Sequence, residues 1–215
     1  MPAQLLITRP EYEAPTRYLS AWSKLIIDEA QHRGMDIIDL DREKAKRNRV
    51  LGTLQKKQTE KMLVVLNGHG GESWIRGQEE VILTTADVKN LLNKIIYARA
   101  CSSAKELGPQ AVAAGALAYI GYDIEFAMYI EEGKVGHPLE DRTAALFMEP
   151  ANYVASSLIK GHPAGEANRR SRKKFAENIQ KIIIEGAKSP YYYTISVLYD
   201  NMVHQVCLGS NEAKI

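Results

Sequence analysis

The chain has 215 residues, of which 45% are hydrophobic and 25% are charged, and its formal net charge is +2. This is an ordinary globular composition, and the chain is long enough for one sizeable core. The small charge argues against a strongly acidic partner. It also argues against nucleic acid as the main ligand, because proteins that bind nucleic acid carry a clear basic excess on one face.

The cysteines and the apolar runs indicate the compartment. Cys101 and Cys207 are too few for a disulfide framework, and no C-x-x-C pattern for a metal ion occurs. The first residues lack the basic start and apolar stretch of a secretory signal, and no apolar run approaches a membrane span. We therefore expect a cytoplasmic protein without a membrane partner. No Pro/Gly/Ser-rich linker divides the chain, so residues 1–215 are interpreted as one domain.

Short apolar runs alternate with amphipathic segments in the first half of the chain. The apolar runs predict strands at residues 4–8, 36–40, 62–66, 93–98 and 116–120. The segments between them predict helices from Pro15 to Gly34, over 42–57, in a short stretch capped by Thr84 or Thr85, and over 109–114. Residues 73–83 predict a hairpin that turns at Gly77.

The second half of the chain is expected to be irregular over residues 122–139 and then helical over 140–160 and 164–185. Residues 194–199 and 204–208 predict a final hairpin. Strands that alternate with helices form mostly parallel sheets covered on both faces. The sequence therefore predicts an α/β fold, a three-layer α/β/α sandwich.

Two reactive side chains, His69 and Cys101, each come three residues after a predicted strand. The carboxyl ends of parallel strands share one edge of the sheet, and successive strands are often neighbours. We therefore expect the two side chains to face each other. A nearby imidazole and a helix beginning after Cys101 would both favour the thiolate. The backbone N–H groups of Gly70 and Cys101 are candidate donors to an oxyanion.

The order of these motifs resembles that of the caspase-like cysteine peptidases. A strand followed by His-Gly, a hairpin, and a strand ending in Ala-Cys appear here as LVVLNGHGG and IIYARACSS. The similarity is greatest to the gingipain-like and CHAT-domain branch, which includes the separase-type catalytic domain. It covers residues 60–209, through the later segments GALAYIGYD, ASSLIKGHPAGEANRRSRKKF and VCLGS.

The resemblance implies a mostly parallel caspase-like sheet and a peptidase that needs no metal or organic cofactor. Cys101 would be the nucleophile and His69 the general acid/base, and a protein or peptide substrate would be cleaved through an acyl-enzyme. The residues after Cys101 are Ser102-Ser103 rather than the caspase signature, which puts aspartate specificity in doubt.

The resemblance also points to the residues that select the substrate. In this family the loop after the fifth strand often forms part of the first specificity pocket, and here it begins Gly121-Tyr122-Asp123-Ile124-Glu125. An acidic residue at the base of that pocket would select Arg or Lys. Asp123 is the first candidate and Glu125 the second, while Asp123 fits a turn equally well.

Two other functions compete with the peptidase. An inactive caspase-like fold would act as a protein-binding or regulatory module. A nucleotide- or phosphate-binding domain would use the glycine-rich segment at residues 67–71, which lacks the Lys-Ser/Thr ending of a P-loop and the G-x-G-x-x-G spacing. The pattern does not determine the oligomeric state.

Overall fold

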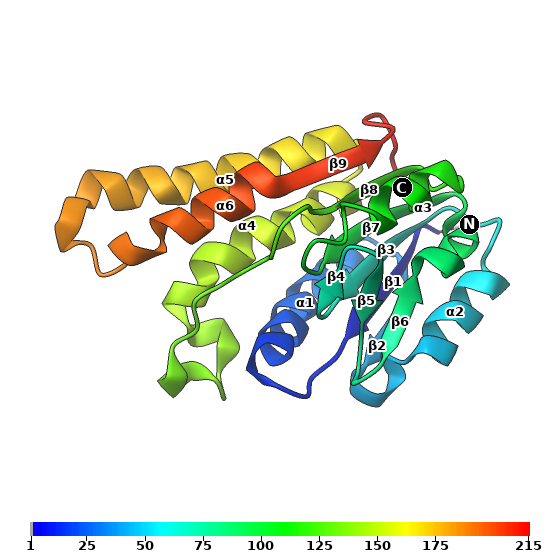
Figure 1. Cartoon of the computed structure of the whole chain (residues 1–215), viewed down its shortest axis with the longest axis horizontal. Coiled ribbons are helices and arrows are strands. Elements are labelled where there is room, and N and C mark those ends of the chain that lie inside the picture. The colour runs from blue at the N-terminus through cyan, green and yellow to red at the C-terminus, as the bar shows by residue number, and fades with distance from the viewer. Residues whose placement is uncertain (1) are drawn as a thin grey trace.

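The strands and helices of the chain are taken from a computed structural model that describes residues 2–215 (Figure 1). The strands are β1 (Gln4–Arg9), β2 (Asp36–Asp41), β3 (Met62–Asn67), β4 (Gly70–Gly71), β5 (Trp74–Arg76), β6 (Val81–Thr84), β7 (Lys94–Arg99), β8 (Ala118–Tyr122) and β9 (Gln205–Gly209). The α-helices are α1 (Ala14–His32), α2 (Arg47–Lys56), α3 (Leu107–Ala113), α4 (Arg142–Ile159), α5 (Ala164–Glu185) and α6 (Ile195–His204).

Six strands form one central sheet in the order β2-β1-β3-β7-β8-β9. The first five run parallel, and β9 pairs antiparallel with β8 at the edge. The short strands β4, β5 and β6 form a separate antiparallel sheet, which contains the hairpin predicted at residues 73–83. The mostly parallel sheet expected from the sequence is thus confirmed.

Alternate side chains of the central strands enter two apolar cores on opposite faces of the sheet. In β3, Leu63 and Val65 pack with α1, α4 and α5 on one face. Met62 and Val64 pack with α2, α3 and the small sheet on the other face. Because both faces are covered, the buried strands consist of near-continuous apolar runs. The three-layer α/β/α sandwich predicted from these runs is confirmed, and Figure 1 shows α4 and α5 running side by side over the sheet.

The predicted C-terminal hairpin is wrong in its first half. Residues 195–204 form α6, and only the segment that follows, β9, is a strand. The run Ile-Ser-Val-Leu-Tyr has high strand propensity, but Leu198 is fully buried against Phe147 of α4 and Phe175 of α5. Tertiary packing overrides local propensity here, because a helix places Leu198 and the buried Asn201 on one face.

The other elements follow the predictions with small shifts. The fifth predicted strand lies two residues later, as β8, and the stretch capped by Thr84 is a 3₁₀-helix, η2 (Thr85–Leu91), rather than an α-helix. Residues 123–141 hold only short 3₁₀ turns between β8 and α4, as expected for an irregular segment. Within residues 2–215, no helix is long and apolar enough to cross a membrane.

Candidate active site

His69 and Cys101 occupy corresponding positions at the ends of two neighbouring strands. In the parallel pair β3 and β7, Asn67 lies opposite Arg99, and each reactive residue follows two positions later. Both side chains line one cavity of about 210 Å³. The structure therefore brings together the two residues that the sequence singled out, at the edge of the sheet where ligands of parallel sheets bind.

Gly68 allows the chain to turn sharply between β3 and His69. Its φ of +145° lies in a region that favours glycine, and an added Cβ would lie 1.9 Å from the carbonyl oxygen of Arg76. The carbonyl of His69 accepts a hydrogen bond of 2.8 Å from the Arg76 N–H. The loop that carries the imidazole is therefore held against β5.

Glu13 also lies at this site, although no pattern in the sequence indicates it. His69 Nε2 forms a hydrogen bond with Glu13 Oε1. Because a carboxylate only accepts, Nε2 carries the proton and Nδ1 remains available for proton exchange. Glu13 directly precedes α1, where Thr16 Oγ1 accepts from the Glu13 N–H at 3.2 Å. From the sequence, Glu13 was an acidic residue in front of a helix, a common arrangement without catalytic meaning.

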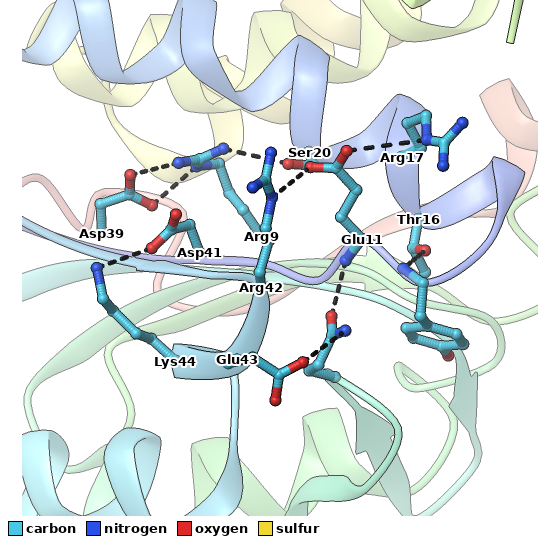
Figure 2. Close-up of polar contacts among 12 residues, drawn as sticks. Arg9, Glu11, Thr16, Arg17, Ser20, Asp39, Asp41, Arg42, Glu43 and Lys44 are labelled. Carbon is cyan, nitrogen blue, oxygen red and sulfur yellow. Dashed lines mark hydrogen bonds and ion pairs between the residues drawn. The ribbon is translucent and has the colours of Figure 1, made fainter. Parts of the chain in front are cut away.

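Ion pairs and hydrogen bonds hold the loop that leads from β1 to Glu13 (Figure 2). Arg9 binds Asp39 through two hydrogen bonds of 2.8 and 2.6 Å. The backbone N–H of Glu11 donates to Gln78 Oε1 at 2.8 Å, and its carboxylate pairs with Arg42 at 3.2 Å. These contacts join the loop to β2 and to the hairpin. They therefore fix the backbone that leads to Glu13, whose carboxylate lies beside His69.

Cys101 is half-buried, and its sulfur contacts the wall of the cavity. Sγ donates a hydrogen bond of 3.9 Å to the carbonyl oxygen of Phe126. Burial raises the pKa of the Cys101 thiol, and the nearby carboxylate of Glu125 adds to this rise. Within the described residues, no hydrogen bond joins Cys101 to His69. Both effects on the pKa favour the neutral thiol over the thiolate.

The helix predicted over residues 109–114 is α3, which begins two residues earlier than predicted, and the segment from Cys101 that leads into it is not itself helical. Residues 101–106 form turns, and α3 begins only at Leu107. Ser102 has a left-handed backbone with φ of +55°, and its N–H donates to the carbonyl of Ile124 at 2.8 Å. Gly108 and Pro109, both poor helix formers, lie at the start of this seven-residue helix. A helix N-terminus is thus not adjacent to the thiol, so the predicted help from a helix dipole is absent.

A buried arginine, Arg99, lies beneath the cavity at the end of β7. Its guanidinium is fully buried and donates to Asn67 Oδ1 at 2.7 Å, Asn152 Oδ1 at 2.6 Å and Ser23 Oγ at 2.5 Å. Burial lowers the pKa of Arg99, and in the described part of the chain no carboxylate pairs with it. Arg99 therefore joins the ends of β3 and β7 to α1 and α4 through neutral side chains alone.

The two predicted substrate-binding carboxylates lie outside the cavity. Asp123 Oδ1 accepts a hydrogen bond of 2.7 Å from His204 Nδ1, and the Asp123 N–H donates to the His204 carbonyl at 3.2 Å. Glu125 is exposed. Neither residue lines the cavity that His69 and Cys101 share, so their roles toward substrate stay predictions. Among residues 2–215, no group of three or more His, Cys, Asp or Glu side chains is arranged to hold a metal ion.

The architecture is shared with a known structure. No protein-family model and no curated protein matches the sequence. A chain of the complex of Porphyromonas gingivalis RgpB pro- and mature domains is similar, with a TM-score of 0.60 and 13% identity over 98% of this chain. The fold is caspase-like. The match covers 47% of the RgpB chain, so this chain spans about half of that length, and at 13% identity the similarity shows the fold alone.

Proposed function

We propose that this caspase-like chain is a cysteine peptidase with Cys101 as nucleophile and His69 as general acid/base. One observation carries the proposal: three neighbouring strands, β1, β3 and β7, lead into Glu13, His69 and Cys101 at one edge of the sheet. A thiol, an imidazole beside it and a carboxylate that orients the imidazole are the parts of an activated nucleophile. The similarity to RgpB supports the caspase-like fold on which this proposal rests, and the CHAT-domain branch stays a prediction.

The proposed reaction begins when the Cys101 thiol turns from the Phe126 carbonyl and gives its proton to His69. The sulfur then attacks the carbonyl carbon of the peptide bond, and a tetrahedral oxyanion forms. Its collapse breaks the C–N bond, the leaving amine takes the proton from His69, and a thioester to Cys101 remains. Water then attacks the thioester while His69 accepts its proton, and Cys101 leaves with that proton restored. Glu13 would stabilise the imidazolium in both steps.

The backbone around Gly70 supports its predicted role at the oxyanion. An added Cβ at Gly70 would lie 2.5 Å from the Cys101 carbonyl oxygen and 2.9 Å from the Cys101 nitrogen. The two candidate N–H donors are thus on segments in direct contact. The N–H of Cys101 makes no backbone hydrogen bond within the described residues, so it is free to donate to an oxyanion.

Substitution of Gly70 by alanine is expected to lower kcat/KM for peptide hydrolysis by roughly 100-fold, because the added methyl group displaces one donor. Gly133→Ala is the matched control, since an added Cβ there meets nothing within 4 Å. Thermal melting of both variants would verify that they fold. Wild-type kcat/KM in the folded Gly70→Ala protein would remove Gly70 from the oxyanion site.

Preferential alkylation of Cys101 tests the peptidase directly. Burial raises the pKa of Cys207 in β9 to about 11, and no histidine pairs with that thiol in the described part of the chain. With limiting iodoacetamide at pH 7, we expect Cys101 to react at least ~10-fold faster than Cys207, as measured by peptide mass spectrometry. Cys101→Ala should then abolish the hydrolysis of fluorogenic peptides.

Equal and slow alkylation of the two cysteines would contradict the proposal. It would favour the competing interpretation, an inactive caspase-like fold that binds or regulates other proteins.

The predicted preference for Arg or Lys substrates is a separate question. It requires Asp123 or Glu125 to reach the substrate, and Asp123→Ala would leave the turnover of arginine substrates unchanged if that prediction is wrong.

A further inference from the structure

The cavity beside Cys101 is walled by apolar side chains. Leu19 of α1 and Phe126, Met128 and Ile130 of the segment after β8 all line it. The last three alternate along the chain and pack against the same apolar cluster around Leu19, as side chains on one side of an extended segment do. The volume of about 210 Å³ is below the roughly 300 Å³ at which pockets for whole small molecules begin. The cavity is therefore suited to a single side chain.

Few charges face this cavity. Among the described residues that line it, none carries a carboxylate. Arg99 also lines it, but its guanidinium is fully buried and already donates to three neutral side chains. Three carboxylates lie near the site without lining the cavity: Asp123 is engaged by His204, Glu13 by His69, and Glu125 is exposed. A charged substrate side chain would lose its hydration here without gaining a partner, whereas an apolar one would be transferred out of water favourably.

The wall formed by residues 126–130 is held in place before any substrate arrives. The buried Asn201 of α6 accepts from the Ala127 N–H at 3.2 Å and donates to the Ala127 carbonyl at 2.7 Å. Tyr129 lies between Met128 and Ile130 but does not line the cavity. Its ring packs edge-on against Tyr193, with ring centroids 5.0 Å apart. A preformed apolar wall costs little ordering on binding, so its shape selects the side chain that enters.

Building on the proposed peptidase function, we propose that this cavity receives an apolar substrate side chain next to the cleaved bond. Leucine, methionine and phenylalanine are the class of side chain that its lining and volume suit. The cavity begins at Cys101 and His69, so the bound side chain belongs to a residue adjoining the attacked carbonyl. For the same reaction, the cavity thus favours an apolar side chain over the basic one predicted from the sequence.

A set of peptidyl chloromethyl ketones tests this inference. Three reagents identical except for Leu, Arg or Asp next to the reactive ketone are compared by their second-order rates of Cys101 alkylation. Each rate is divided by the rate with iodoacetamide, which occupies no specificity pocket. We expect the Leu reagent to react at least ~10-fold faster than the Arg and Asp reagents, the range that apolar pockets achieve.

A pair of neighbouring substitutions locates the pocket. Met128→Asp places a carboxylate on the cavity wall and is expected to reverse the order, with the Arg reagent faster than the Leu reagent. Tyr129→Asp adds the same charge one residue away, on a side chain that is 41% exposed and does not line the cavity. That control should keep the wild-type order, and near-UV circular dichroism would verify the fold of both variants.

The outcomes separate the inference from the proposed function. Equal rates for the three reagents, or a faster Arg reagent in the wild-type protein, would overturn the apolar pocket while rapid iodoacetamide labelling of Cys101 still supported the peptidase. Slow labelling of Cys101 by iodoacetamide itself would overturn the peptidase and the pocket together. The wild-type comparison is decisive even if Met128→Asp does not fold.

Discussion

Replacement of His69 by alanine is expected to slow both iodoacetamide labelling of Cys101 and peptide hydrolysis at pH 7 by at least ~100-fold. General acid–base catalysis by a positioned side chain contributes roughly 100- to 10,000-fold, and here no helix N-terminus adjoins the thiol as a second activator. Burial also raises the pKa of Cys101, so without a base the thiolate fraction at neutral pH is small. Rates of alkylation and of fluorogenic peptide turnover measure the effect.

The pH profile distinguishes loss of a base from a general loss of structure. In the His69→Ala protein, labelling depends on ionisation of the thiol alone. Because the pKa of Cys101 is raised above its ordinary value, this rate should rise about tenfold per pH unit and reach its plateau only in the alkaline range. In the wild-type protein, transfer of the proton to His69 should support labelling at neutral pH.

Two further variants control this experiment. His32→Ala removes an exposed histidine from the last turn of α1, so it should leave both rates at the wild-type level. Glu13→Gln keeps a hydrogen-bonding partner for His69 but removes the negative charge, and its rates should fall between wild type and His69→Ala. Identical labelling in the wild-type and His69→Ala proteins at every pH would refute the dyad.

Substitution of Arg99 by methionine is expected to lower the free energy of unfolding by about 3 kcal/mol. Methionine fills much of the space but donates no hydrogen bond, so the buried side-chain oxygens of Asn67 and Asn152 lose a charged donor. Each buried polar group left without a partner costs roughly 1–3 kcal/mol. Removal of the Arg99 guanidinium also removes the cost of burying its charge, which offsets part of this loss. The cost of leaving the Asn67 and Asn152 oxygens without a donor is the larger of the two.

Urea unfolding of the wild-type and variant proteins measures this difference. Arg33→Met is the matched control, because Arg33 is exposed at the end of α1 and its replacement should change stability by less than ~0.5 kcal/mol. Labelling of Cys101 should also slow in the Arg99 variant, since Arg99 and Asn67 end the strands that position the two reactive residues. A variant as stable as wild type would show that the desolvation cost of the guanidinium equals the value of its hydrogen bonds.

The sequence by itself determined the strands of the sheet and the placement of two reactive residues. Apolar runs such as Met62–Asn67 are local signals, because a strand buried on both faces is apolar at nearly every position. His69 and Cys101 follow such runs directly, and the carboxyl ends of parallel strands share one edge. Their shared cavity could therefore be anticipated without knowledge of any long-range contact.

Only the tertiary structure decided which other side chains reach that edge. Glu13 lies 56 residues before His69, and the contact exists because β1 is the neighbour of β3 on the side away from β7. Residues 126–130 are apolar or aromatic throughout, so the sequence does not show which of them face the cavity. Their position depends on hydrogen bonds to Asn201 of α6, a helix that the local run of β-branched residues did not predict. Strand order and helix packing are set by burial across the whole chain, and a local pattern does not contain that information.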